Sequence, residues 1–376
     1  MSDGGEVVIV GGGIVGSACA YELAKRGAKP ILLEYGKSGM QATNAAAGML
    51  APLSEHIEPG PMLEFTLRAL REYPAGVEEL QATCGFDLEL RLTGILKVAF
   101  DDEQPETLRR AYAWHRQMGF DVEWLDGAAC RELEPRVSER VSAGVFSAAE
   151  GNVSNQQVAL ALLRAAAAHG AVIHERTPVT GFRRRAGRIV AVRSNDREFA
   201  CDAVVLAAGA RTGQIARRLG VDLPVVPVRG QMMALGGMRQ PIAHPVWGPD
   251  GYLVPRANGL VFAGSTSERV GFRRRTTDAG VRRIRATASA LVPQLRAAHM
   301  HFAWAGLRPG SPDDLPFIGP MPRVENAFAA TGHYRNGILL GPLTGRLVAE
   351  ALLSGDWSAI PAAFSPGRFA PVAAAV

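Results

Sequence analysis

Val7-Val8-Ile9-Val10-Gly11-Gly12-Gly13-Ile14-Val15-Gly16 is the stretch that decides the fold of this 376-residue chain. Its apolar start is typical of a parallel strand buried on both faces. The glycines then match G-x-G-x-x-G, and apolar residues at helical spacing predict a helix from about Ile14 to Arg26. A second strand, 31–33, ends at Glu34. Strand, glycine loop, helix, strand and acid in this order predict a dinucleotide-binding unit rather than a mere tight turn.

Each part of this unit has a physical task. Gly11 permits the tight turn, Gly13 lets backbone N–H groups approach a pyrophosphate, and Gly16 lets the helix pack close to the strand. The helix N-terminus favours the phosphate charge. Glu34 can accept hydrogen bonds from the hydroxyls of the adenosine ribose.

The segment after this unit bears on which dinucleotide binds. Residues 39–49, Gly-Met-Gln-Ala-Thr-Asn-Ala-Ala-Ala-Gly-Met, are mostly small. An NAD-binding domain would go straight on to its next helix and strand, whereas small residues here let the chain pass close to a bulky group such as a flavin. A small-residue helix packed for closeness explains the same composition, so this segment favours FAD without settling the choice.

Later segments predict two kinds of sheet. Helices are expected over 62–83, 107–118, 158–168, 278–295 and 338–353, and strands over 88–100, 172–173, 188–193, 198–201, 202–209 and 328–331. Short strands at 225–228, 231–235, 252–255 and 260–263 indicate an antiparallel sheet. The predicted fold class is α/β plus antiparallel β, with two interleaved domains. A Rossmann-like FAD-binding domain takes 1–85, 145–220 and 300–376, and a substrate-binding domain takes 86–144 and 221–299.

Composition narrows the possible partners. The net charge is +5, but only four of the 41 basic residues are lysine, so the excess reflects an arginine bias rather than a nucleic-acid surface. Arg183–Arg185 before Ala186-Gly187 is read as a hairpin turn, and Arg273–Arg275 as a solvated run, with a rim over an anionic substrate as the minor alternative. The four cysteines offer no metal-ligand spacing. No signal peptide or apolar run of spanning length is found, which predicts a cytoplasmic protein without membrane contact.

A set of motifs near the C-terminus is more specific than the glycine loop. Ala305-Gly306-Leu307-Arg308-Pro309 is followed by Asp314–Gly319 and then by Thr331-Gly332-His333-Tyr334-Arg335-Asn336-Gly337. With the N-terminal unit, these motifs resemble the glycine oxidases of the D-amino-acid oxidase family over essentially the whole chain. The resemblance implies non-covalent FAD, oxidation of glycine or an N-substituted glycine to an imine or glyoxylate, and reduction of O2 to H2O2. It also suggests a homo-oligomer.

The resemblance assigns roles to individual residues. Arg308, in what looks like a loop, and Tyr252 would hold the substrate carboxylate, since a guanidinium matches a carboxylate with two parallel bonds. Arg335 would lie near the amine, and Met49 would line the substrate pocket. His333 is expected to be structural, in a loop whose backbone faces the cofactor. The residues expected at the cofactor are Gly11, Gly13, Ile14, Val15, Gly16, Glu34, Thr43, Asn44, Ala45, Ala46, Gly48, Met49, Val179, Ala208, Gly209, Arg308, His333, Arg335, Asn336, Gly337, Ile338 and Leu339.

Three departures from the family pattern concern the substrate. Ser267 stands where these proteins often carry methionine, Arg211 stands where tryptophan is common, and 151–155 lacks the usual acid and proline. If Ser267 opens the amine side of the pocket, the substrate would be a bulky N-carboxymethyl amino acid of a biosynthetic pathway.

Other activities stay open at this point. A sarcosine oxidase with covalent flavin is disfavoured, because that relative attaches FAD through a cysteine in the C-terminal half and the last cysteine here is Cys201. An amino-acid dehydrogenase that passes electrons to a quinone would not form peroxide in air. A flavin-binding protein without turnover would not be bleached by any amine. An NAD-dependent dehydrogenase has no use for the C-terminal motifs.

Overall fold

A computed structural model describes residues 6–56, 58–100, 104–195, 197–238 and 242–369. One half contains a six-stranded sheet with the order β18-β19-β12-β1-β2-β8. All its neighbours pair in parallel except β18 with β19. The strands are β1 Glu6–Val10, β2 Lys29–Leu33, β8 Val172–His174, β12 Ala203–Leu206, β18 Phe317–Pro320 and β19 Ala327–Thr331. The predicted first strand, second strand and 203–206 segment are confirmed.

Helices and a small sheet cover the two faces of this parallel sheet. The helical face holds α1 Ile14–Lys25, α4 Pro61–Cys84, α7 Asn155–Ala168 and α10 Gly337–Ser354. On the opposite face, a second hydrophobic core lies between the parallel sheet and two elements, a helix and a three-stranded sheet. The helix is α8 Thr212–Arg217, and the sheet consists of β9 Gly181–Arg185, β10 Arg188–Ser194 and β11 Arg197–Ala200. α10 is long and apolar enough to cross a membrane, but two thirds of it is buried, as in any core helix.

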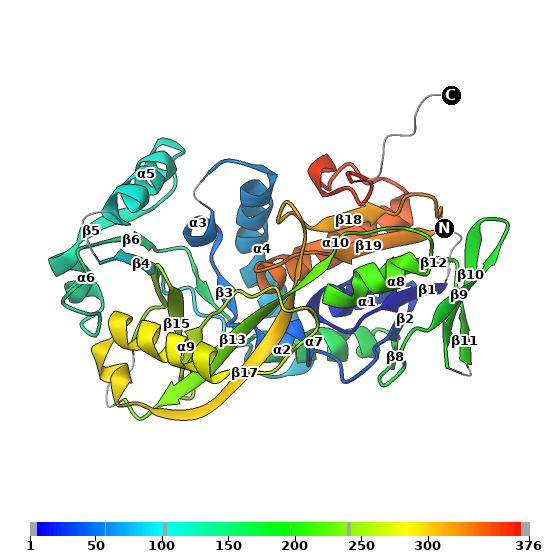
Figure 1. Cartoon of the computed structure of the whole chain (residues 1–376). Helices are drawn as coiled ribbons and strands as arrows, with labels where there is room; N and C mark the ends of the chain where they lie inside the picture. The colour runs from blue at the N-terminus through cyan, green and yellow to red at the C-terminus, as the bar shows by residue number, and fades with distance from the viewer. Residues whose placement is uncertain (1–5, 57, 101–103, 196, 239–241, 370–376) are drawn as a thin grey trace.

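The second half is built on an eight-stranded sheet with the order β17-β13-β16-β15-β14-β4-β6-β5 (Figure 1). Neighbours are antiparallel except β14 with β4. α5 Gln104–Gln117, α6 Gly127–Leu133 and α9 Asp278–Leu291 belong to this half. The strands are β4 Ile95–Ala99, β5 Glu123–Asp126, β6 Ala143–Ser147, β13 Val226–Gly236, β14 Val246–Gly248, β15 Gly251–Pro255, β16 Val261–Gly264 and β17 His299–Gly310.

Short elements lie where the two halves meet. They are α2 Ala42–Ala45, α3 Pro52–Glu55, and a two-stranded ribbon of β3 Met49–Leu50 with β7 Gly151–Asn152. Figure 1 shows the long strands β13 and β17 running from the antiparallel half toward the parallel half. These strands therefore carry residues of one half to the edge of the other.

Several local predictions were wrong. Residues 225–228 and 231–235 form one continuous strand, β13, and the Arg308 segment is strand β17 rather than a loop. The region 88–100 is a strand only over β4, with an isolated bridge at Arg91. The arginines 183–185 lie on β9, and the turn itself is 186–187. We propose the same division into two interleaved domains, although β17 lies in the antiparallel sheet across the proposed boundary at 300.

Candidate active site

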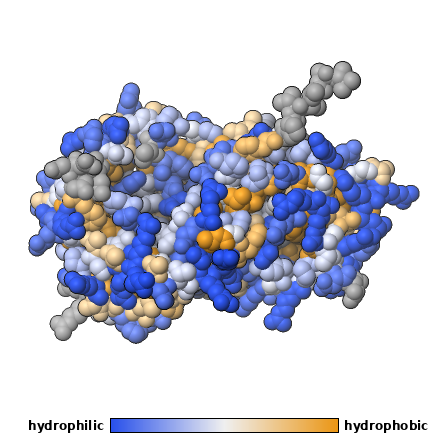
Figure 2. Space-filling model, in the orientation of Figure 1, coloured by the Kyte–Doolittle hydropathy of each residue, from blue (hydrophilic) through white to orange (hydrophobic). Residues whose placement is uncertain are grey.

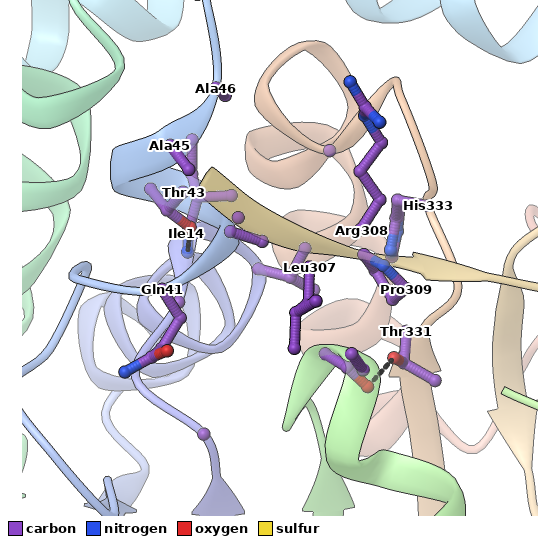
Figure 3. Close-up of a pocket in the computed structure, with 18 of the residues that line it drawn as sticks. Ile14, Gln41, Thr43, Ala45, Ala46, Leu307, Arg308, Pro309, Thr331 and His333 are labelled. Atoms are coloured by element: carbon purple, nitrogen blue, oxygen red, sulfur yellow. Dashed lines mark hydrogen bonds between the residues drawn. The ribbon is translucent and has the colours of Figure 1, made fainter. Parts of the chain in front are cut away.

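A single cavity of about 660 Å³ joins the glycine loop of the parallel half to β13, β15 and β17 of the antiparallel half. This volume lies within the range of roughly 300–1,000 Å³ typical of cofactor and ligand sites. Figure 2 shows an apolar area near the middle of a face that is otherwise largely hydrophilic. In Figure 3, Gln41, Thr43 and Ala45 lie on one side of the cavity, and Arg308 and His333 on the other.

The dinucleotide end of the cavity is formed by the glycine loop and Glu34. Gly16 packs so closely that an added Cβ would lie 1.9 Å from the carbonyl oxygen of Gly11. Glu34 is buried, and its two carboxylate oxygens accept the N–H groups of Gly12 at 2.8 Å and Gly36 at 2.9 Å. Burial raises the pKa of Glu34, although the two hydrogen bonds favour the charged carboxylate and oppose this rise. Each oxygen keeps a lone pair, so Glu34 can still accept from ribose hydroxyls.

The first turn of α1 opens into the cavity and holds no acidic residue. The positive end of the helix dipole is therefore available to a phosphate. Thr43, from the small-residue segment, accepts the N–H of Ile14 at 3.0 Å through its hydroxyl and fixes α2 beside the loop. The residues present fit the adenosine and diphosphate parts of FAD.

The small-residue segment also touches the antiparallel half. A Cβ on Gly306 of β17 would lie 2.4 Å from the Cβ of Ala45. Trp304 donates its indole N–H to the carbonyl of Ala45 at 3.1 Å. Part of the segment is thus a short helix, α2, and its small side chains allow β17 to pass close by. The close-packed helix is confirmed in part, and a close approach of this segment to a flavin stays a prediction.

Arg308 projects from β17 over the partner strand β13. Its Nη1 donates to the carbonyl of Thr266 at 3.0 Å, and its Nη2 donates to the hydroxyl of Ser265 at 2.6 Å. The guanidinium covers Gly230, where an added Cβ would lie 2.5 Å from both terminal nitrogens. Its partners are neutral, and it forms no ion pair with any described residue, so its positive charge remains available to an anionic ligand.

Tyr252 lies on β15 of the same sheet, where it pairs with Gly264, and it is 7% exposed. Its hydroxyl contacts the sulfur of Met232 at 3.5 Å, which is a weak acceptor. Trp247 stands opposite it in the strand register, with the two ring centroids 5.6 Å apart. The hydroxyl therefore keeps most of its capacity to donate to a substrate.

Arg335 has an acidic partner, unlike Arg308. Its Nε lies 2.5 Å from a carboxylate oxygen of Glu55, although the N–H direction is poor and that nitrogen makes no regular hydrogen bond. The two opposite charges attract at this separation whatever the direction of the N–H bond. Its guanidinium also lies 5.5 Å from the ring centre of Trp247. Burial lowers the pKa of Arg335, but Glu55 outweighs it and the pKa is raised, so this side chain stays charged.

The position of Glu55 is fixed by hydrogen bonds of Glu150 and Lys97 to the residues that precede it in α3. The carboxylate of Glu150 accepts the N–H groups of Leu53 and Ser54 at 2.5 and 3.0 Å and also contacts the Ser54 hydroxyl. Lys97 donates to the Ser54 carbonyl at 2.7 Å. Complete burial raises the pKa of Glu150 to about 7. These contacts hold α3, and with it Glu55, in a fixed place beside Arg335.

His333 is structural in its contacts, as expected. Its Nε2 lies 3.0 Å from the Thr344 hydroxyl of α10, and complete burial lowers its pKa to about 3. The imidazole is therefore neutral around pH 7. It joins the loop 332–336 to the core helix whose N-terminus faces the cavity.

Most of the predicted residues come together around this one cavity. Those that line it are Gly11, Gly13, Ile14, Val15, Glu34, Thr43, Ala45, Ala46, Gly48, Met49, Val179, Ala208, Gly209, Tyr252, Arg308, His333, Arg335, Asn336, Gly337 and Ile338. Gly16 and Leu339 are packed behind the lining, and Asn44 accepts from Gln156 through its side chain.

Ser267 does not line the cavity. Its side chain is exposed, and its hydroxyl lies 3.3 Å from the hydroxyl of Tyr334, which does line the cavity. The expectation that a small residue here enlarges the pocket gains no support from this position.

Sequence reasoning missed several lining residues. Glu55, Trp247, Tyr35 and Phe272 all face the cavity, yet they come from short or irregular segments without a motif. Arg211, seen in the sequence as a departure from the family pattern, lines the cavity as well. No signal in the sequence indicated Glu55, the acidic partner of Arg335.

The chain is similar to known proteins over most of its length. A family model described as FAD dependent oxidoreductase matches residues 6–351. The glycine oxidase of Geobacillus kaustophilus is 37% identical over 92% of this chain and 92% of its own length. That of Pseudomonas aeruginosa is 35% identical over 96% of this chain and 98% of its own. The crystal structure of the Geobacillus kaustophilus enzyme superposes with a TM-score of 0.93 at 36% identity, over 97% of this chain and 99% of that one.

Proposed function

The chain belongs to the family of FAD dependent oxidoreductases, and on that premise we propose that it is an FAD-dependent glycine oxidase. It oxidises the CH–NH2 group of glycine, or the CH–NH group of an N-substituted glycine, with O2 as the acceptor. One observation carries the proposal. Arg308 presents a guanidinium without an acidic partner among the described residues, in the same cavity as a complete dinucleotide cradle.

The protein's own residues bind and orient the substrate. Arg308 and Tyr252 hold the carboxylate between them, and this fixes the direction of the Cα–H bond. Correct positioning of reactants supplies up to roughly 7–11 kcal/mol of a barrier in the best cases. FAD held by the glycine loop, Glu34 and the first turn of α1 would supply the two-electron acceptor for this oxidation, with O2 as the final acceptor of the electrons. The neutral amine nitrogen contributes its lone pair to the new C=N bond.

Release of the product completes the reaction. Water hydrolyses the imine, so glycine, O2 and H2O give glyoxylate, ammonia and H2O2. No general base is required once the amine is neutral, and Arg335 cannot act as one because its raised pKa keeps it protonated. The paired charges of Arg335 and Glu55 leave the amine side of the pocket close to neutral, and this favours the uncharged amine.

The same pairing selects among substrates. Arg308 can take one carboxylate, while the charge of Arg335 is already balanced by Glu55. The pocket is therefore suited to monocarboxylates such as glycine and sarcosine, and a second carboxylate on the amine side would meet Glu55. Nothing in the lining formed by the described residues favours the bulky N-carboxymethyl alternative.

Anaerobic titration of the purified holoenzyme tests the function. Glycine and sarcosine should bleach the oxidised-flavin absorption, and air should restore it with formation of one equivalent of H2O2. Iminodiacetate should bleach it poorly, because it adds a second carboxylate to sarcosine. Failure of every amine to bleach the flavin would refute the enzyme assignment, and reoxidation by quinone but not by O2 would make the protein a dehydrogenase.

The remaining parts of the proposal rest on the family resemblance. We propose a cytoplasmic location and a homo-oligomer without nucleic-acid or membrane partners. Sedimentation analysis at several protein concentrations would measure the oligomeric state.

A further inference from the structure

An irregular segment of the antiparallel half reaches across the cavity. Residues 269–276, which we name the strap, connect Glu268 to the N-cap of α9 at Thr277. The base of the strap is firmly held, because Glu268 accepts from Nε and Nη2 of Arg229 at 2.9 and 3.0 Å and from Gln231 at 2.9 Å. Arg229 is 6% exposed, so this anchor is buried. The strap itself is largely exposed.

The tip of the strap meets the dinucleotide half through aromatic and cationic groups. The guanidinium carbon of Arg211 lies 5.0 Å from the ring centre of Phe272 on the strap. It also lies 5.0 Å from the ring centre of Tyr35, which directly follows Glu34. All three side chains line the cavity. Arg211 therefore links the two halves beside the residue that faces the ribose.

A second contact lies closer to the glycine loop. Arg274 of the strap donates to the side-chain oxygen of Gln41. Gln41 belongs to the turn in which Gly39 donates to the carbonyl of Gly12 at 2.7 Å. Arg274 and Gln41 both line the cavity. The strap is thus attached at two points to the segment that follows Glu34, beside the loop that takes the diphosphate.

Neither of these two arginines is in salt-bridge contact with an acidic side chain of the described residues, although Arg211 lies near enough to Glu34 to oppose the rise in the pKa of that carboxyl. Arg211 has an amide oxygen of Gln214 at 3.5 Å, Arg274 has the amide oxygen of Gln41, and neither forms an ion pair with a described residue. The N-terminus of α1 opens into the same cavity. Two guanidinium groups, neither of them in an ion pair with a described residue, and a helix N-terminus around one cavity form a site for a dianion, which is the charge of a dinucleotide diphosphate.

We propose that Arg211 and Arg274 bind the diphosphate half of FAD and, through Phe272 and Gln41, hold the strap closed over it. Bound FAD then leaves only when the strap opens. The proposal rests on FAD being the cofactor, as in the proposed function, and not on which amine is oxidised. Tryptophan at position 211 could cover the site but could not supply the charge.

Release of FAD from the holoenzyme tests the proposal without any turnover. The variants Arg211→Ala, Arg274→Ala and Phe272→Ala are diluted, and free flavin is followed by its fluorescence. Each should release FAD about tenfold faster than the wild type, because a cation–π contact or a charged hydrogen bond is lost. Arg273→Ala is the matched control, since Arg273 is an exposed strap residue that does not line the cavity. It should release FAD at the wild-type rate.

Two further measurements separate binding from folding. FAD affinity of Arg211→Ala should fall less steeply with salt than that of the wild type, whereas Phe272→Ala should keep the wild-type salt dependence, since it removes no charge. The melting temperature of the FAD-free protein should be the same in all variants. Release rates within twofold of wild type in both Arg211→Ala and Phe272→Ala would overturn the proposal, and so would an equal loss of stability with and without FAD. A protein that binds a different flavin, or none, would instead refute the cofactor of the proposed function.

Discussion

A methyl group added at Gly230 should weaken substrate binding without touching the substrate. The Cβ of alanine at this position would lie 2.5 Å from both terminal nitrogens of Arg308 and 2.6 Å from its central carbon. Ordinary contact begins at 3.4 Å, so the guanidinium must move by nearly an ångström. The three nearest atoms all belong to this side-chain tip, and the tip can move while the backbone of β13 stays in place.

The expected magnitude follows from the bonds that orient Arg308. Those to Ser265 and Thr266, at 2.6 and 3.0 Å, hold the fork that faces the substrate, and a shift of this size breaks both. A hydrogen bond to a charged group contributes about 1.5–3 kcal/mol. Loss of one such bond to the carboxylate corresponds to a rise in KM of about 10- to 150-fold at about 1.36 kcal/mol per tenfold.

Initial rates from a peroxide-coupled assay would give KM and kcat for glycine with Gly230→Ala. KM should rise far more than kcat falls, and the FAD content should equal that of the wild type. Gly236→Ala is the matched control in the same strand, because its Cβ would displace the imidazole tip of the exposed His301, which is not part of the cavity lining. A KM within twofold of wild type in Gly230→Ala would show that the position of Arg308 does not govern carboxylate binding.

Three other predictions concern single residues. Tyr252→Phe removes one neutral hydrogen bond and should raise the KM for glycine by about 2- to 12-fold; an unchanged KM would remove Tyr252 from the carboxylate site. Gly16→Ala would bring a Cβ to 1.9 Å from the Gly11 carbonyl oxygen, so the purified protein should lack flavin absorption, and full FAD content would contradict this packing. His333 has a folded-state pKa of about 3, below its unfolded value of about 6.5, so the unfolded state binds the extra proton and stability is lost as the pH falls through this window. The urea-unfolding free energy of His333→Gln should therefore change less between pH 7 and pH 4.5, by up to about 1.4 kcal/mol per pH unit, and an equal slope would refute it.

The dinucleotide unit could be predicted because its signals are local. Strand, glycine loop, helix and Glu34 follow one another within about thirty residues, as the motif requires. The long strands β13 and β17 were harder to predict, because the glycine and proline residues inside them resemble the ends of a strand in the sequence. Gly230 suggested two strands in place of β13, yet a glycine is needed there so that the Arg308 guanidinium can pack on the backbone.

Arg308 was placed in a loop for a similar reason. Gly306 and Pro309 flank it, but β17 is the edge strand of its sheet, where a proline does not cost a ladder bond to a further neighbour. Gly306 is required by the close approach to Ala45. The ion pair of Glu55 with Arg335 joins residues 280 positions apart, and no periodicity reports a contact of that kind.

Arg308, which is proposed to bind the substrate carboxylate, lies on the long strand β17, whereas much of the remaining cavity lining belongs to short elements. This division affects how the protein can evolve. Mutation can reshape α3 or β14 without disturbing the ladder between β13 and β17. Descendants of this scaffold can therefore exchange one amine for another while the requirement for an amino acid is inherited unchanged. A library that aims at new amines should vary Glu55, Trp247 and Met49 and leave both long strands alone.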